Sequence, residues 1–145
     1  MSGRIMAVDP GEKRIGLAIS DETGTLARGL CVIKHISLKQ DCLEIAKVAQ
    51  NNAVTKIIVG SPMGDNGEER PQMRHAQKVA DVIAEYSNLP VELYDESGST
   101  QKAREIRLQA GANQKNRGGH LDGVAAAVIL QNWLEANHED GKSHA

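Results

Sequence analysis

Three acidic residues that are far apart in the sequence stand at the ends of predicted secondary-structure elements. Asp9 ends a first apolar run, Glu96 follows a later one, and Asp122 lies in the first turn of a predicted helix. Asp122 shares the helical spacing of Ala125, Ala126 and Ile129, which puts it on the side expected to face the core. A carboxylate facing the core is costly unless it is paired or binds a cation. The three acids are therefore candidates for a common site.

Carboxylates gathered at one edge of a sheet would offer oxygen ligands, which Mg²⁺ and Mn²⁺ prefer. Two such ions about 3.5 to 4 Å apart can activate a water on one side of a phosphodiester and stabilise the leaving oxygen on the other. Each acid also has a structural explanation: Asp9 can open a turn, Glu96 can be a surface acid, and Asp122 can favour the helix dipole. Taken together, they predict catalytic residues that bind two ions.

The choice of Glu96 over its neighbour Asp95 rests on strand geometry. Successive side chains of an extended chain point to opposite sides, so only one of the two acids can face the other carboxylates. We select Glu96.

Positive charge is concentrated near these acids. Five cationic residues and one acidic residue lie between positions 102 and 120, in a chain whose net charge is −2. Such a cluster suits a polyanion, although Lys and Arg also serve solubility and His120 can be an ordinary polar residue at a helix start. The candidate nucleic-acid-binding residues are Lys13, Arg14, Arg104, Arg107, Lys115, Arg117 and His120.

Length and composition indicate one globular domain. The chain has 145 residues, of which 40% are apolar, and a chain of this size buries its own core. We expect that domain to span 1–137 and to be followed by a flexible polar tail at 138–145. No stretch approaches the about 18 apolar residues of a membrane span, and the start lacks a signal-peptide layout, so we expect a cytoplasmic protein.

Cysteine and aromatic usage narrows the chemistry. Cys31 and Cys42 match no metal-ligand or redox spacing and are predicted to be reduced packing residues. The aromatic residues are Tyr86, Tyr94 and Trp133. So few aromatic side chains weaken any interpretation in which nucleic-acid bases stack on them.

Hydrophobic patterning predicts the elements that must position these residues. Alternating or continuous apolar runs indicate strands, and apolar residues at three- and four-residue spacing indicate helices. The strands are expected at 4–8, 14–19, 26–34, 56–60 and 91–95, the helices at 38–52, 71–87, 99–110 and 121–134, and an exposed loop at 61–71.

The order of these elements predicts an α/β fold. Three strands joined by tight turns form an antiparallel set, and the β–α alternation that follows adds parallel strands. We therefore predict a mixed five-stranded sheet, with its first three strands antiparallel and helices on both faces. Glu96 would lie near Asp9 if the first and last strands were parallel neighbours.

Four segments resemble the YqgF/RuvX family. They are AVDPGEKRIGLAISDETG at the start, GSPMGDNGE after the fourth strand, DES-x-ST at 95–100 and LDGVAAAVILQNWL near the end. The resemblance runs from about residue 4 to 135. It implies an RNase H-like fold and a function as a Holliday junction resolvase or as a nuclease that matures the ends of pre-16S ribosomal RNA. It also implies that the catalytic carboxylates are Asp9, Glu96 and Asp122.

The chain departs from the family pattern at two places beside these acids. Ser97 and Gly98 stand where the family usually has an Arg after its Asp-Glu pair. Gly118, Gly119 and His120 fill the stretch where a Lys often precedes the last Asp. Both changes remove positive charge beside the scissile phosphate and would affect rate and substrate affinity more than the fold.

We therefore predict a Mg²⁺- or Mn²⁺-dependent endonuclease, first of all one that matures the 5′ end of pre-16S rRNA. A Holliday junction resolvase acting on branched DNA is the alternative within the same chemistry, and it requires a dimer because two strands are cut symmetrically. The oligomeric state, monomer or homodimer, stays open. A binding module without catalysis and a nucleotide-binding ATPase of the actin and sugar-kinase type are the rivals from other classes.

Overall fold

The computed structural model describes residues 3–11, 13–61, 71–95 and 123–143. These residues form strands and helices in the predicted order. The elements are β1 Arg4–Pro10, β2 Arg14–Ser20, β3 Ala27–Lys34, α1 Leu38–Asn51, β4 Val54–Ser61, α2 Pro71–Ser87, β5 Val91–Asp95 and α4 Val124–Ser143.

The strands form one sheet in the order β3-β2-β1-β4-β5. β1 pairs antiparallel with β2, and β2 pairs antiparallel with β3. β4 is parallel to both β1 and β5. The predicted mixed sheet is confirmed, but β1 and β5 are not neighbours, because β4 lies between them.

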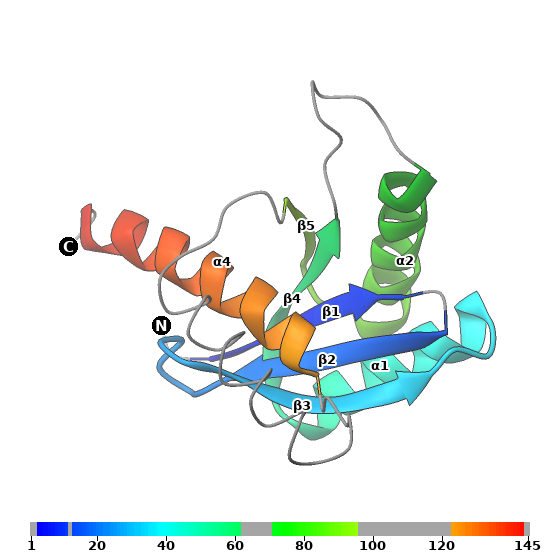
Figure 1. Cartoon of the computed structure of the whole chain (residues 1–145). Coiled ribbons are helices and arrows are strands. Elements are labelled where there is room, and N and C mark those ends of the chain that lie inside the picture. The colour runs from blue at the N-terminus through cyan, green and yellow to red at the C-terminus, as the bar shows by residue number, and fades with distance from the viewer. Residues whose placement is uncertain (1–2, 12, 62–70, 96–122, 144–145) are drawn as a thin grey trace, which may run out of the picture.

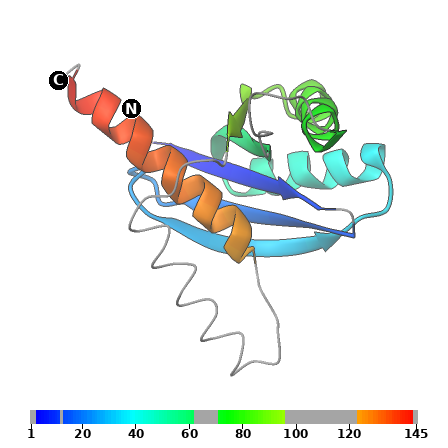
Figure 2. The same cartoon turned by 45° about the horizontal axis from the view of Figure 1, so that its top comes forward.

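Helices cover both faces of this sheet (Figures 1 and 2). Side chains alternate along β1, so that Met6 and Val8 pack with residues of α1 and α2. Ala7, between them, packs against α4 on the other face, together with Ile58 of β4. The two apolar cores make the central strand buried on both sides, as predicted for a sheet covered on both faces.

The helix boundaries agree with the patterning at α1 and differ at α4. The hydroxyl of Ser37 accepts the N–H of Gln40 at 3.2 Å and caps α1. α4 begins at Val124 rather than at the predicted Leu121, because Gly123 has a positive φ that interrupts a helix, and it runs to Ser143, past the predicted end at Leu134. The prediction rests on the apolar stripe, which ends near Leu134, whereas the helix continues through the polar residues that follow.

Some expected elements lie outside the described residues. These are the helix at 99–110 and all but the two ends of the loop at 61–71. The flexibility expected for 138–145 stays a prediction. Among the described residues, no helix is long and apolar enough to cross a membrane.

The turn between β2 and β3 is built around one carboxylate. Oδ1 of Asp21 accepts the N–H groups of Thr25 and Leu26 at 2.8 and 3.2 Å, and Oδ2 accepts the hydroxyl of Thr23 at 2.6 Å. These hydrogen bonds, that of Thr23 first, hold the pKa of Asp21 below its ordinary 3.8.

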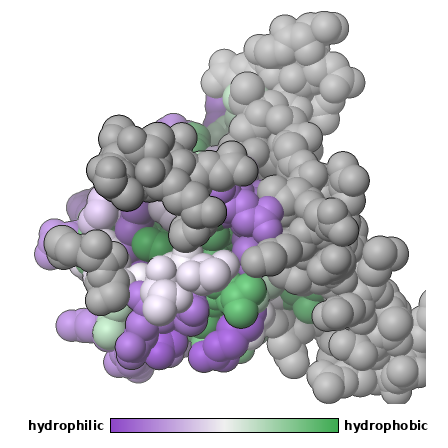
Figure 3. Space-filling model, turned by 90° about the vertical axis from the view of Figure 1, so that its left-hand side faces the viewer, coloured by the Kyte–Doolittle hydropathy of each residue, from purple (hydrophilic) through white to green (hydrophobic). Residues whose placement is uncertain are grey.

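Figure 3 views the side that lies on the left in Figure 1, and hydrophilic residues cover much of its described surface.

Replacing Asp21 by Asn should therefore give a pH-dependent loss of stability. Because the pKa is lowered in the folded state, the ionised carboxylate stabilises the fold above the unfolded-state pKa, and this contribution disappears as the pH falls through the lower folded-state pKa. We expect D21N to have a lower Tm than the unsubstituted protein at pH 7. The two Tm values should be nearly the same at a pH low enough to protonate the Asp21 carboxyl of the unsubstituted protein in both its folded and unfolded states. A constant difference in Tm from neutral to strongly acid pH would contradict this assignment.

Candidate active site

Asp9 lies in the central strand, at the end of β1 that borders the hairpin. It pairs with Gly16 of β2 and is the penultimate residue of the strand. Alternation places it on the face of Ala7, the face that α4 covers. A Cβ built on Gly16 would lie 3.8 Å from Cβ of Asp9 and 3.7 Å from Cα of Gly123. The end of β1 and the start of α4 therefore meet over Gly16.

The environment of Asp9 disfavours its charge. The residue is half-buried, and burial raises the pKa of its carboxyl above the ordinary 3.8. Within the described part of the chain, no hydrogen bond or ion pair reaches this carboxylate. Asp9 also belongs to the strand ladder, since Pro10 continues the pairing and the turn begins at Gly11. A turn-opening role does not account for these features, and the role of Asp9 as a cation ligand stays a prediction.

The start of α4 is fixed by a glycine on the backbone of β2 and β3. Gly123 has a φ of +77°, and its carbonyl accepts the N–H of Ala127 at 2.9 Å, which begins the helix. A Cβ at this position would lie 2.2 Å from the carbonyl oxygen of Leu17 and 3.1 Å from that of Cys31. Both the dihedral angle and the contact require glycine.

The hairpin between β1 and β2 is equally tight. The N–H of Gly11 donates to the carbonyl of Arg14 at 3.0 Å, and a Cβ on Gly11 would come within 2.4 Å of that oxygen. Lys13 and Arg14 are exposed at its end. The structure thus places these two predicted substrate contacts at the same edge of the sheet as Asp9.

The other predicted site residues lie outside the described part of the chain. They are Glu96, Arg104, Arg107, Lys115, Arg117, His120 and Asp122. The described residues contain no group of three His, Cys, Asp or Glu side chains that could hold a metal ion. Asp9 supplies an oxygen donor suited to Mg²⁺ or Mn²⁺, and the complete ligand set stays a prediction.

The strand register adds one residue that the sequence analysis does not identify. Lys34, at the end of β3, is the direct cross-strand partner of Arg14. A β-bulge between Leu17 and Ala18 shifts the pairing by one residue. Counting residues outward from the turn between β2 and β3 therefore gives the wrong cross-strand partner for Arg14. The hydrophobic pattern contains no signal for the right partner, Lys34.

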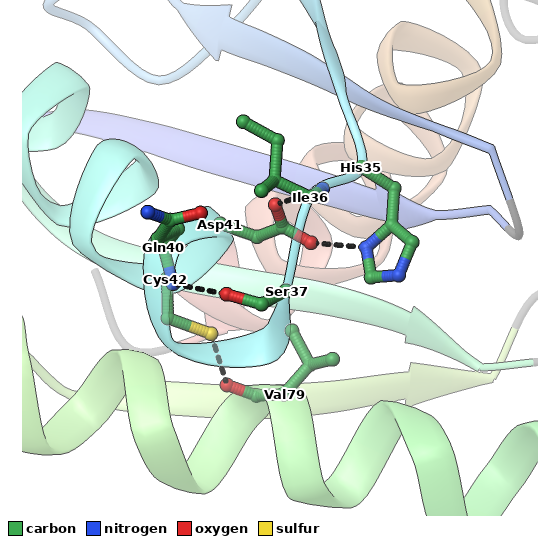
Figure 4. Close-up of polar contacts among 7 residues, drawn as sticks. All are labelled: His35, Ile36, Ser37, Gln40, Asp41, Cys42 and Val79. Carbon is green, nitrogen blue, oxygen red and sulfur yellow. Dashed lines mark hydrogen bonds and ion pairs between the residues drawn. The ribbon is translucent and has the colours of Figure 1, made fainter.

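The cysteines have the packing role predicted for them. Cys31 is half-buried and Cys42 is buried, and neither forms a disulfide bond. Sγ of Cys42 contacts the carbonyl of Val79 at 3.8 Å (Figure 4). Burial and the charge of Asp41 raise the pKa of Cys42 to about 11, so its thiol is unreactive at neutral pH.

Comparison with solved structures defines the class of fold. RuvC of Thermus thermophilus matches over 94% of this chain and 96% of its own length, with a TM-score of 0.59 and 16% identity. The fowlpox virus resolvase, solved in complex with substrate Holliday junction DNA, matches over 92% of this chain and 97% of its own, with a TM-score of 0.54 and 16% identity. The fold is therefore RNase H-like, as predicted.

Sequence comparison defines the family. Residues 3–136 match the family model described as "RuvX: Holliday junction resolvase". A "Putative pre-16S rRNA nuclease" of Myxococcus xanthus is 39% identical over 134 residues, which cover 92% of this chain and 89% of the relative. One of the same name from Symbiobacterium thermophilum is 40% identical over 133 residues, covering 92% of each.

The chain belongs to the RuvX family. This membership confirms the predicted family and, with it, the prediction of a hydrolytic nuclease.

Two glycine substitutions should separate a required glycine from a tolerant one. An alanine at 123 adds strain at positive φ and a clash with backbone, so G123A should lower the free energy of unfolding by about 2 to 4 kcal/mol. A Cβ on Gly16 would meet its neighbours at no less than 3.7 Å, which is ordinary contact. We expect G16A to change that free energy by less than about 1 kcal/mol in the same urea titration. Equal effects would contradict the contact described for Gly123.

Proposed function

We propose that this protein is a cytoplasmic nuclease that hydrolyses phosphodiesters during maturation of the 5′ end of pre-16S rRNA. The observation that carries this proposal is the identity of 39 and 40% with the two relatives named for that activity, over nearly the full length of both chains. The half-buried acid at the end of the central strand is the chemical feature that such a nuclease requires.

Asp9 and Asp122 are proposed as two of the catalytic carboxylates. Asp122 is bonded to Gly123, and Gly123 lies with Asp9 against the same point above Gly16. Since consecutive Cα atoms are about 3.8 Å apart, the chain has little freedom to take Asp122 far from Asp9. This short connection supports the proposal that Asp9 and Asp122 are ligands in one site.

Glu96 is proposed as the third carboxylate. Along β5, Tyr94 packs in the core beneath α4, and Glu92 accepts Nε1–H of Trp133 from α4 at 2.6 Å. Positions 92 and 94 thus face the side on which Asp9 lies, and continued alternation would give the same side to 96 rather than to Asp95. β5 is two strands from β1, about 10 Å away, so the carboxylates would enclose a space between them.

The proposed site would hold Mg²⁺ or Mn²⁺, as two ions, between Asp9, Glu96 and Asp122. When bound, such ions neutralise charge on the scissile phosphate and activate the attacking water. The chain's own contribution is to hold the carboxylate of Asp9 at the end of the central strand β1. It also supplies cations, Lys13 and Arg14 among the described residues, that draw in the phosphate backbone.

Holliday junction resolution is the second candidate. The description of the family and the likeness of the fold to RuvC favour it. The chemistry at the carboxylates would be the same for RNA and DNA. The distinction lies in assembly, because symmetric cutting of a junction needs two sites related by a twofold axis.

Replacing Asp9 by Asn should abolish catalysis while preserving the fold. We expect D9N to cleave RNA about 100-fold more slowly or worse in saturating Mn²⁺ or Mg²⁺, because an amide is a poor substitute for an anionic ligand. Its Tm without metal should not fall, since burial already disfavours the charged carboxylate. The matched control is D81N, an exposed acid on α2, which should cleave normally. Unchanged cleavage by D9N would favour the non-catalytic binding module.

Substrate choice and mass should distinguish the two nuclease functions. We expect the protein to cleave an RNA carrying the 5′ precursor sequence of 16S rRNA faster than a four-way DNA junction, and to be a monomer on that RNA. Mass measurement with each substrate, beside the cleavage assays, provides the test. A dimer on the junction that makes paired symmetric cuts would support resolution instead.

A further inference from the structure

Two cations stand directly opposite each other at the edge of the sheet that carries Asp9. Arg14 opens β2, Lys34 closes β3, and the two are a cross-strand pair. Both residues are exposed. Neither takes part in an ion pair within the described part of the chain, where the carboxylates that do form ion pairs are Glu22, Asp41 and Glu92.

This arrangement is unfavourable for the isolated protein. Directly opposed residues of an antiparallel pair have their Cβ atoms about 4.5 to 5.5 Å apart, and like charges there are destabilising. β3 is an edge strand, and a single lysine would protect such an edge from pairing with another chain. That role does not explain why its partner is an arginine, whereas a shared anionic ligand does.

The pair lies on the same face of the sheet as Asp9. Asp9, Gly16 and Val32 are aligned across β1, β2 and β3. Arg14 and Lys34 are each two residues further along their strands, so their side chains return to the same face. The pair is thus displaced from Asp9 by about 7 Å along the strands and by about 5 to 10 Å across them. Long cationic side chains there can reach a phosphate close to one held at Asp9.

Several contacts fix the position of Lys34. The next residue, His35, donates its backbone N–H to the carbonyl of Lys13 at 2.9 Å, which ties the end of β3 to the hairpin. Its ring Nδ1 contacts the carboxylate of Asp41 in the first turn of α1 (Figure 4). Asp41 is 5% exposed and also accepts the N–H of Ile36 at 2.9 Å. The lysine therefore extends from a backbone that is held on both sides.

The opposite end of these strands has a different charge pattern. There Nη2 of Arg4 lies 3.7 Å from Oε1 of Glu22, and Asp21, the residue after β2, adds a second acid. At the Asp9 end, Lys13, Arg14 and Lys34 lie together beside the hairpin, which is on the right in Figure 1. Glu12, between Gly11 and Lys13 in the sequence, is outside the described residues. Among the described residues, Lys13, Arg14 and Lys34 thus form no ion pair at the end that carries the candidate site, whereas Arg4 is paired at the opposite end.

We propose that Arg14 and Lys34 form a phosphate-binding pair that holds the sugar–phosphate backbone of the substrate next to the scissile position. This inference rests on the proposed nuclease function and extends it by a residue, Lys34, that lies on a different strand from Asp9 and Arg14. The pair contacts phosphate without reading bases, so it acts on RNA and DNA strands alike. Its internal repulsion is relieved when a phosphate lies between the two side chains.

Binding of a labelled single-stranded RNA in EDTA tests the pair without cleavage. K34Q should bind about threefold to tenfold more weakly at low salt, and the slope of log K against log[salt] should become shallower by about 0.7 to 0.9. Its Tm without RNA should stay the same or rise, because a like-charge contact is removed. K34R should restore affinity and slope. K47Q, an exposed lysine of α1 on the opposite side of the sheet, should match the unsubstituted protein.

The outcomes separate this inference from the proposed function. If the unsubstituted protein cleaves RNA but K34Q binds RNA with the same affinity and salt slope, the proposed phosphate-binding pair is wrong and the proposed nuclease function is supported. If RNA binding by the unsubstituted protein depends on Lys34 as predicted, but the protein cleaves no nucleic acid with Mn²⁺ or Mg²⁺, the phosphate-binding pair is supported and the proposed nuclease function is wrong. A lower Tm in K34Q with no rescue by K34R would assign Lys34 a structural role and overturn the pair.

Discussion

The contact between Gly123 and the carbonyl oxygens of Leu17 and Cys31 is the constraint on which the candidate site depends. It lets the first residue before α4 lie directly on the backbone of β2 and β3. From that point α4 crosses the sheet, burying Ala126 and Leu130 against β1 and β2. A side chain at 123 would lift the helix start from the sheet and with it the position next to Asp9. Helix packing and site geometry thus have one common cause.

The burial that stabilises this face makes Asp9 unfavourable as an isolated acid. The same strand that buries Met6, Ala7 and Val8 completely brings the carboxyl of the next residue, Asp9, into a half-buried position. Burial disfavours the charged form, and a divalent cation would favour it. The strand therefore supplies an anion that gains most from a ligand. Stability and function act in opposite directions at this residue.

The sequence predicts the parts of the fold that follow from local patterning. Alternation and turn residues give the strands and the β1–β2 hairpin, and Ser37 marks the start of α1. Strand order is a property of tertiary packing, so the sequence does not reveal that β4 separates β5 from β1. At the site, the sequence proposes Asp9 only in combination with the two other acids, and the structure adds its half-buried position at the end of β1. The need for glycine at 123 depends on a backbone contact between distant residues, which no spacing encodes.

The bulge in β3 shows how one irregularity can change the chemistry of an edge. Pairing of Ser20 with Ala27, continued without interruption, would put Ile33 opposite Arg14 and turn Lys34 to the other face. The extra residue at Leu30 shifts the register, so that Lys34 joins Arg14 on the face of Asp9. The same bulge lies beside the carbonyl of Cys31, against which Gly123 packs. One extra residue in the edge strand therefore has two effects: it lies beside the backbone on which Gly123 packs, and it aligns Lys34 with Arg14. The packing of α4 and the positive charge offered to a phosphate backbone thus depend on the same irregularity.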